Sequence, residues 1–173
     1  MNEIIFSYLN KSDFSTVSND IFNILADNMT VIAPTGNSRE EDYNLWYEAV
    51  NDGLQRPERQ IVLIKDSEKF IGFFQYYTNT DTFMMEEIQF KYEYQSKGIF
   101  RKLFGFVISD ISENIKFVEA YANISNSKSI GILKKLGLTE MCLNKMEEAI
   151  ISKGNILICL SGLIRRGVCE HIP

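Results

Sequence analysis

The chain has 173 residues, which suggests one domain over residues 1–173 that buries roughly 70% of its unfolded surface without disulfides or metal ions. Its 45% hydrophobic and 24% charged residues are ordinary for a soluble globular protein, and the net charge of −5 argues against a nucleic-acid partner and allows a cationic one. No run approaches the ~20 apolar residues of a membrane span and no signal peptide is evident, so we expect a cytoplasmic protein without membrane contact.

The first half of the chain predicts a strand, two helices and three strands. The first helix follows Ser12 and Asp13, which are good N-caps, and the second begins with a capping box formed by Ser38 and Glu41. Gly72, inside the middle strand of the three, suggests a bulge or a close contact. The predicted elements are a strand over residues 3–9, a helix that fades near 28, a helix from 38 that stops at 51–53, and strands over 60–65, 70–77 and 82–90.

The second half predicts a long amphipathic helix over residues 98–113, ended by Asn114, and then a parallel strand over 117–122. A further helix is capped by Ser125 and Asn126 and ends at Gly137. Strands over 138–143 and 155–160 close the pattern, with a short helix over 145–153 between them. The fold class is therefore α+β, with a mixed, mostly antiparallel twisted sheet of about seven strands flanked by about four helices.

Aromatic residues of the second helix, namely Tyr43, Trp46 and Tyr47, could line a small-molecule site, but core packing is the preferred interpretation. The three cysteines have no metal-binding spacing, so we expect reduced thiols and no metal. Cys142 and Cys159 lie in apolar runs and are expected to be buried. The chain's single histidine, His171, is not expected to carry protons in a reaction.

The strand that ends at Phe90 leads through a polar turn into the helix that starts at Gly98. The first N–H groups of a helix lack intrahelical partners and carry partial positive charge, so this junction suits a phosphate group. Lys97, Arg101 and Lys102 add cations around it. An ordinary strand-to-helix connection with a solvated basic rim is the alternative.

Two motifs resemble the GNAT superfamily of N-acyltransferases. Gln95 and Gly98 match the pyrophosphate loop Q/R-x-x-G-x-G/A, whereas Phe100 stands where a small residue is usual. Asn126 and Ser129, followed by a helix that ends in Gly137-Leu138, match N-x-x-A/S followed by k-x-G-F. The Asn-x-x-Ser form is similar to the branch of ribosomal-protein alanine and small-amine acetyltransferases.

This resemblance implies that acetyl-CoA is a cosubstrate bound in a V-shaped cleft between the strands that end at Phe90 and Ala122. Backbone groups near Ile88 and Phe90 would pair with the pantetheine amides, and the N–H groups of 96–101 would hold the pyrophosphate. Asn126 would contact the pantetheine arm and Ser129 the phosphate or adenine side. The implied cofactor-binding residues are Ile88, Phe90, Gln95, Ser96, Lys97, Gly98, Ile99, Phe100, Arg101, Asn126 and Ser129.

Catalysis in this superfamily is direct attack of an amine on the thioester, which needs a base for the ammonium proton. Glu86 and Glu87 are neighbours on one strand and point to opposite faces, so one of them can face the cleft as that base. The superfamily's usual acid is a tyrosine at the position of Leu133. Tyr121 and Ser129 are the substitute hydroxyls, unless water supplies the proton or positioning dominates.

The expected function is therefore transfer of an acetyl group from acetyl-CoA to a primary amine, either a small amine or a protein N-terminus. A non-catalytic acyl-CoA-binding or interaction module on the same fold is the alternative, because Phe100 and Leu133 depart from the pattern. A homodimer is possible in such folds.

Overall fold

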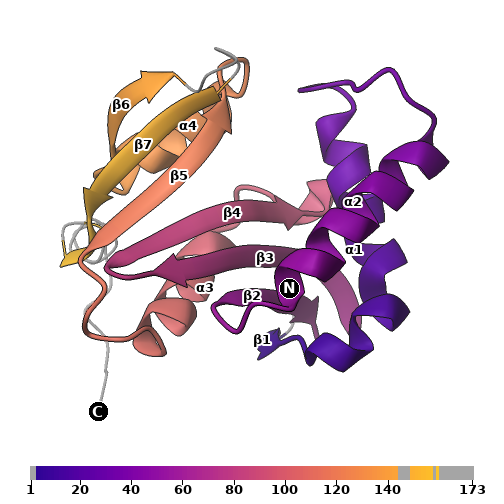
Figure 1. Ribbon diagram of the computed structural model, residues 1–173, viewed down its shortest axis with the longest axis horizontal. Helices are drawn as coiled ribbons and strands as arrows, with labels where there is room; N and C mark the ends of the chain where they lie inside the picture. The colour runs from indigo at the N-terminus through magenta and orange to yellow at the C-terminus, as the bar shows by residue number, and fades with distance from the viewer. Residues whose placement is uncertain (1–2, 144–148, 158, 160–173) are drawn as a thin grey trace. The chain divides into compact units, whose positions relative to one another are not determined.

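The computed structural model describes residues 3–143, 149–157 and 159, and Figure 1 labels their helices and strands. The strand order is β1-β2-β3-β4-β5-β7-β6, with parallel pairing between β4 and β5 and antiparallel pairing in β1–β2, β2–β3, β5–β7 and β6–β7. The predicted α+β class, with a mixed sheet of about seven strands and about four helices, is confirmed: the described residues form seven strands and the helices α1 to α4. Described residues up to 77 and residues 86–106 form a first compact unit, and 78–85 with those from 107 onward form a second.

The strands of the first unit begin with β1 (Ile4–Tyr8), β2 (Arg59–Asp66) and β3 (Lys69–Asn79). The register between β2 and β3 shifts between Ile64 and Lys65, and Ile64 pairs with Gly72. The bulge or close contact that Gly72 suggested is therefore present in β3. A Cβ at Gly72 would collide with the backbone oxygen of Gln89 on β4 (Thr82–Phe90). Glycine is therefore needed here for close approach of two backbones.

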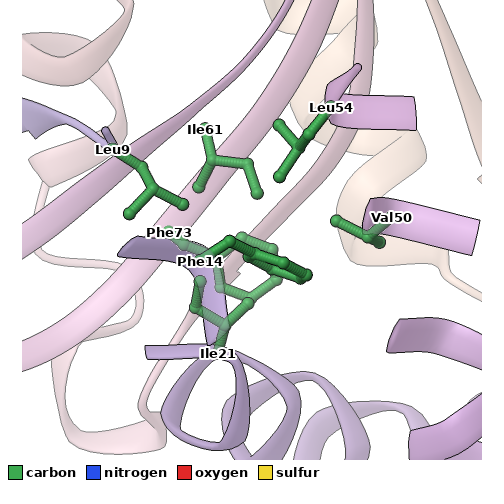
Figure 2. Close-up of a cluster of buried hydrophobic side chains, with 7 residues drawn as sticks. All are labelled: Leu9, Phe14, Ile21, Val50, Leu54, Ile61 and Phe73. Atoms are coloured by element: carbon green, nitrogen blue, oxygen red, sulfur yellow. The ribbon is translucent and has the colours of Figure 1, made fainter. Parts of the chain in front are cut away.

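Helices α1 (Phe14–Met29) and α2 (Arg39–Leu54) pack against these strands in the first unit. Figure 2 shows the core they share, whose seven buried side chains come from α1, α2, β2, β3 and the residue after β1. Trp46 and Tyr47 pack against this core, and both rings lie within 6 Å of Phe14. Core packing therefore accounts for these two aromatics. The core side chains are Leu9, Phe14, Ile21, Val50, Leu54, Ile61 and Phe73.

The ends of α1 and α2 differ in part from the sequence expectation. The capping box of α2 is confirmed, with Ser38 Oγ accepting from the Glu41 N–H and Glu41 Oε2 accepting from the Ser38 N–H. Of the two caps expected for α1, Asp13 is the N-cap residue, although its side chain makes no cap bond. Ser12 is not a cap of α1, because residues Lys11–Asp13 form a 3₁₀ turn that is capped by Asn10. Helix α2 also continues through Gly53 to Leu54, because the stop expected at glycine is overridden by tertiary packing.

In the second unit, β5 (Phe117–Asn123) pairs with β7 (Ala149–Asn155), which pairs with β6 (Thr139–Leu143). The parallel register of β4 with β5 runs from Thr82–Phe117 to Met85–Ala120. Helix α4 (Ser127–Lys135) is followed by Leu136 as its C-cap and then by Gly137, whose φ of 88° is left-handed, as a helix-stop glycine requires. The N–H of Leu138 bonds to the Leu133 oxygen and that of Gly137 to the Lys134 oxygen, the Schellman pattern.

Three expectations for the second half of the chain are wrong. Helix α3 (Ile99–Ser109) ends four residues before 113, where i→i+3 bonds at Asp110 and Ile111 tighten a stretch rich in Ser and Asp. The last strand is Ala149–Asn155, so neither a helix over 145–153 nor a strand over 155–160 forms within the described residues. A short apolar run such as 156–160 does not distinguish strand from helix.

Cys142 is exposed on β6, contrary to expectation, because all five residues of that strand are exposed. Cys159 is buried as expected, in helical backbone instead of a strand, and burial raises the pKa of its thiol to about 11. Residues 144–148, Cys169 and His171 lie outside the described residues. Within the described part of the chain, no helix is long and apolar enough to cross a membrane, and no group of three His, Cys, Asp or Glu side chains could hold a metal ion.

Candidate active site

The turn between β4 and α3 has a backbone suited to a bound anion. After β4 the chain forms a 3₁₀ turn, η2 (Tyr92–Tyr94), and then two left-handed residues, Ser96 with φ 61° and Gly98 with φ 74°. An added Cβ at Gly98 would meet nothing within 4 Å, so the need for glycine lies in the backbone angle. The space beside Gly98 lies at the start of α3, where helical N–H groups lack intrahelical partners.

Tyr94 fastens this turn to the hairpin between β2 and β3. Its hydroxyl donates to Asp66 Oδ2 over 3.2 Å, and the ammonium groups of Lys69 and Lys97 lie 5.3 and 5.4 Å from its ring centre. Lys69 also bonds Glu93 at 3.1 Å. The contact with the Tyr94 ring keeps the cation of Lys97 at this turn, two residues before α3.

Phe100, the bulky residue of the loop motif, is half-buried with its ring 5.8 Å from that of Phe104, one turn further along α3. The N–H of Arg101 donates to the Gly98 oxygen over 3.2 Å. The ring therefore rests on its own helix, and the first turn of α3 is closed by a tight backbone bond.

Gln95, the first residue of the loop motif, faces inward. Its Nε2 donates to Asn28 Oδ1 at 3.2 Å and to the Phe90 carbonyl oxygen at 3.3 Å. Asn28 Nδ2 donates to the same carbonyl at 2.9 Å and to Gln89 Oε1 at 2.7 Å. Sequence reasoning did not single out Asn28, at the end of α1, or Gln89.

Glu86 and Glu87 have different partners, as expected for neighbours on a strand. Glu86 receives two bonds from the Arg59 guanidinium and one from Gln75 Nε2 at 3.1 Å. The carboxylate and the guanidinium are both about one-fifth exposed. Glu86 is therefore committed to a bidentate ion pair between strands.

Among the residues that the structure describes, no cation is paired with Glu87. Burial raises the pKa of its carboxyl to about 7, and the charge of Glu86 raises it too, whereas hydrogen bonds from Gln89 and the Ile88 N–H lower it. Gln89 Nε2 lies 2.6 Å from Glu87 Oε1. A carboxyl that titrates near neutral pH can take up and release a proton under physiological conditions.

An open groove of about 640 Å³ runs along α1 in the first unit. Its carboxylates are Asp20, Asp27 and Glu93. Two of the three are already paired, Asp27 with Arg39 at 3.0 Å and Glu93 with Lys69 at 3.1 Å. The groove therefore carries little unpaired negative charge with which to select a cation.

The other expected site residues belong to the second unit. Asn126 caps α4, with its Oδ1 accepting the Ser129 N–H at 3.0 Å. Tyr121 is half exposed, with its hydroxyl 3.5 Å from Glu119 Oε1. Leu133, at the position where the superfamily usually has its tyrosine acid, is 8% exposed. A buried apolar side chain therefore stands at this position of α4 in place of a hydroxyl group. Lys134, near the end of α4, pairs with Glu140 at 2.8 Å.

Solved structures share this architecture over most of the chain. The PaiA N-acetyltransferase of Thermoplasma acidophilum in complex with coenzyme A superimposes with a TM-score of 0.74 at 15% identity, over 88% of this chain and 99% of that one. The fold is that of the GNAT acetyltransferases. A GNAT acetyltransferase from Elizabethkingia anophelis with acetyl-CoA bound gives 0.61 at 14% identity, over 90% and 99% of the two chains. The spermidine N-acetyltransferase of Vibrio cholerae in complex with CoA and spermine superimposes with a TM-score of 0.61 at 16% identity, over 91% of this chain and 98% of that one.

At these identities the likeness establishes the GNAT fold and not a branch of the family. No protein-family model and no curated protein matches the sequence. The motif positions Gln95, Gly98 and Asn126 therefore remain candidates. Asn28 and Arg59 have no local sequence signal, whereas Gln89 shares the strand alternation of Glu87 and could have been found from it.

Proposed function

We propose that the protein is an acetyl-CoA-dependent N-acetyltransferase that acts on a primary amine, either a small amine or a peptide N-terminus. The observation that carries the proposal is Glu87, a half-buried carboxyl with a pKa of about 7 on the strand that leads to the anion-suited turn. The GNAT fold, shared with CoA-bound acetyltransferases, supports it.

The residues of the turn fit the diphosphate of CoA. The left-handed angles of Ser96 and Gly98 and the open space beside Gly98 leave backbone N–H groups accessible, and Lys97 and Arg101 add positive charge. Ile99 and Phe100 contribute the first helical N–H groups. When bound, acetyl-CoA supplies an acetyl group that is activated as a thioester.

The pantetheine arm is proposed to pair with the backbone of β4 at Ile88. The carbonyl of Phe90 already accepts from Asn28 and Gln95, so Phe90 would contribute its N–H group instead. From the second unit, the Nδ2 group of Asn126 is the candidate for an amide contact, since its Oδ1 caps α4, and Ser129 is the candidate for the phosphate side.

Glu87 is the proposed base. An ammonium group must lose a proton before its nitrogen can attack the thioester carbon, and a base whose pKa is near the working pH does this best. The new C–N bond replaces the C–S bond, and the sulfur leaves as the CoA thiol after it gains a proton. Glu86 is unsuited to this task because Arg59 holds its charge.

Release of the CoA thiol from acetyl-CoA across a panel of primary amines tests the proposal, with spermine and spermidine included because of the Vibrio cholerae relative. Glu87→Gln should lower the rate by about 10²–10⁴-fold, the usual contribution of a general base. Glu86→Gln, on the adjacent residue, should leave a far larger part of the rate.

The second candidate function is a non-catalytic acyl-CoA-binding module, which the apolar Leu133 in place of an acid favours. It predicts that CoA raises the melting temperature whereas no amine releases thiol. Absence of CoA binding at millimolar concentration would refute both functions.

A further inference from the structure

Three side-chain amides of the first unit form a continuous chain that ends at Glu87. Gln95 donates to Asn28, Asn28 donates to Gln89, and Gln89 donates to Glu87, over 3.2, 2.7 and 2.6 Å. We call Gln95, Asn28 and Gln89 the amide chain. All three residues are half-buried, and they come from the loop before α3, the end of α1 and β4.

The direction of the amide chain is set by the backbone oxygen of Phe90. A carbonyl oxygen can only accept hydrogen bonds, and the Nδ2 of Asn28 and the Nε2 of Gln95 both lie within 3.3 Å of it. Asn28 must therefore present its donor to this oxygen. The same donor reaches Gln89 Oε1, so Gln89 is left with its NH₂ group toward Glu87.

A reversed Gln89 would present a carbonyl oxygen to the Glu87 carboxylate. Two acceptors in contact repel, whereas an N–H donor stabilises the ionised carboxylate. Asn28 touches neither the thioester nor an amine in this scheme. It acts through Gln89.

We propose that Asn28 is a positioning residue that fixes Gln89 with its NH₂ group toward Glu87 and joins this pair to Gln95 of the loop. The inference rests on the proposed function for its catalytic meaning, because that function makes Glu87 the base. The geometry itself concerns only hydrogen bonds within the first unit.

The other charge that acts on Glu87 among the described residues is Glu86, which is held by Arg59. Neither side chain belongs to the amide chain. A change at Asn28 therefore reaches Glu87 through Gln89, apart from any charge that the substitution itself adds.

The test measures the titration of Glu87 directly, by carbon NMR of protein labelled at the glutamate carboxyl carbons. The Glu87 signal is the one lost in Glu87→Gln. Asn28→Asp puts acceptors against Gln89 Oε1 and the Phe90 oxygen, so Gln89 should reverse and the midpoint should rise by about one pH unit. Asn28→Leu, which is neutral and similar in shape, should raise it by less.

Asn23→Asp is the matched control, because it adds the same charge on the same helix at an exposed residue whose side-chain oxygen binds Arg39. The proposal is overturned if Asn28→Asp moves the midpoint no further than Asn23→Asp does. If the Asn28 variants fail to fold, Gln89→Met and Gln95→Leu replace them. Gln89→Met should raise the Glu87 midpoint by as much as is expected of Asn28→Asp, and Gln95→Leu should raise it by less. An unchanged midpoint in Gln89→Met overturns the proposal.

Titration calorimetry with CoA, on the same wild-type sample, keeps this result separate from the proposed function. Shifted Glu87 midpoints without CoA binding would leave Asn28 as the residue that orients Gln89 and would remove the acetyltransferase assignment. CoA binding together with unshifted Glu87 midpoints in the variants would retain the acetyltransferase assignment and would show that Asn28 does not position Gln89.

Discussion

Arg59 donates hydrogen bonds to the Glu86 carboxylate from two guanidinium nitrogens, Nε and Nη2, and Nε lies 2.7 Å from Glu86 Oε2. The guanidinium rests against α2 at Gly53, where an added Cβ would collide with Arg59 Nη1. The ion pair thus depends on a glycine inside a helix. Its neighbour Glu87 has no part in this pair, and burial raises the pKa of the Glu87 carboxyl to about 7.

Gly53→Ala should destabilise the protein although alanine favours helices. The substitution gains up to about 1 kcal/mol of helix propensity, but it displaces Arg59 and loses charged hydrogen bonds worth about 1.5–3 kcal/mol. Urea unfolding should report a net loss of about 1–2 kcal/mol. In a Glu86→Gln background the cost of Gly53→Ala should shrink, because the pair is already broken, and strict additivity would contradict this dependence.

The free energy of unfolding should fall as pH rises because of Glu87. Its pKa is raised from 4.5 to about 7 on folding, so between these values the folded protein binds more protons than the unfolded chain. This contribution is fully present below pH 4.5 and is lost as pH rises through 7. Glu87→Gln should therefore gain stability relative to wild type by up to about 1.4 kcal/mol per pH unit across that window. Urea titrations from pH 5 to 8 measure the difference, and parallel curves would exclude it.

Gly98, just before α3, and Gly105, within α3, can be compared by the same substitution to alanine. A Cβ would meet nothing within 4 Å at either residue, but Gly98 alone of the two has a left-handed φ. Gly98→Ala should cost about 1–2 kcal/mol of backbone strain and weaken CoA binding as the turn shifts. Gly105→Ala, in an exposed helix interior, should gain up to about 1 kcal/mol and leave CoA binding unchanged. Equal CoA affinity in the two variants would argue against a diphosphate at this turn.

Asn126 has two separable roles. Asn126→Ala removes the cap of α4 and should cost about 1 kcal/mol. Asn126→Asp keeps an acceptor for the Ser129 N–H and suits the helix dipole, so stability should be retained. It lacks the Nδ2 donor proposed for the pantetheine arm, so the affinity for CoA should fall. Titration calorimetry with CoA measures whether Asn126 contacts the ligand. If Asn126→Asp binds CoA with wild-type affinity, Asn126 serves only as the cap of α4.

Local patterns predicted much of the fold and part of the candidate site. The capping box at Ser38, the stop at Gly137 and the glycine of the β4–α3 turn are each set by neighbours within a few residues, so the sequence expresses them. The last strand was misplaced because the apolar run after Asn155 outweighed the weaker alternation of Ala149–Asn155. Cys142 was expected to be buried because an apolar run does not say whether its strand is covered.

By itself, the sequence determined the order of strands and helices as far as β6 and the position of the anion-suited turn, because hydrophobic periodicity, caps and glycine angles act locally along the chain. The tertiary structure alone decided which partners Glu86 and Glu87 have. Arg59 is 27 residues from Glu86, and Asn28 is 61 residues from Gln89. Folding brings these partners within hydrogen-bonding distance, so that Glu86 is bound by Arg59 and Gln89 is held beside Glu87. Folding also buries Glu87, and this burial raises the pKa of its carboxyl to about 7.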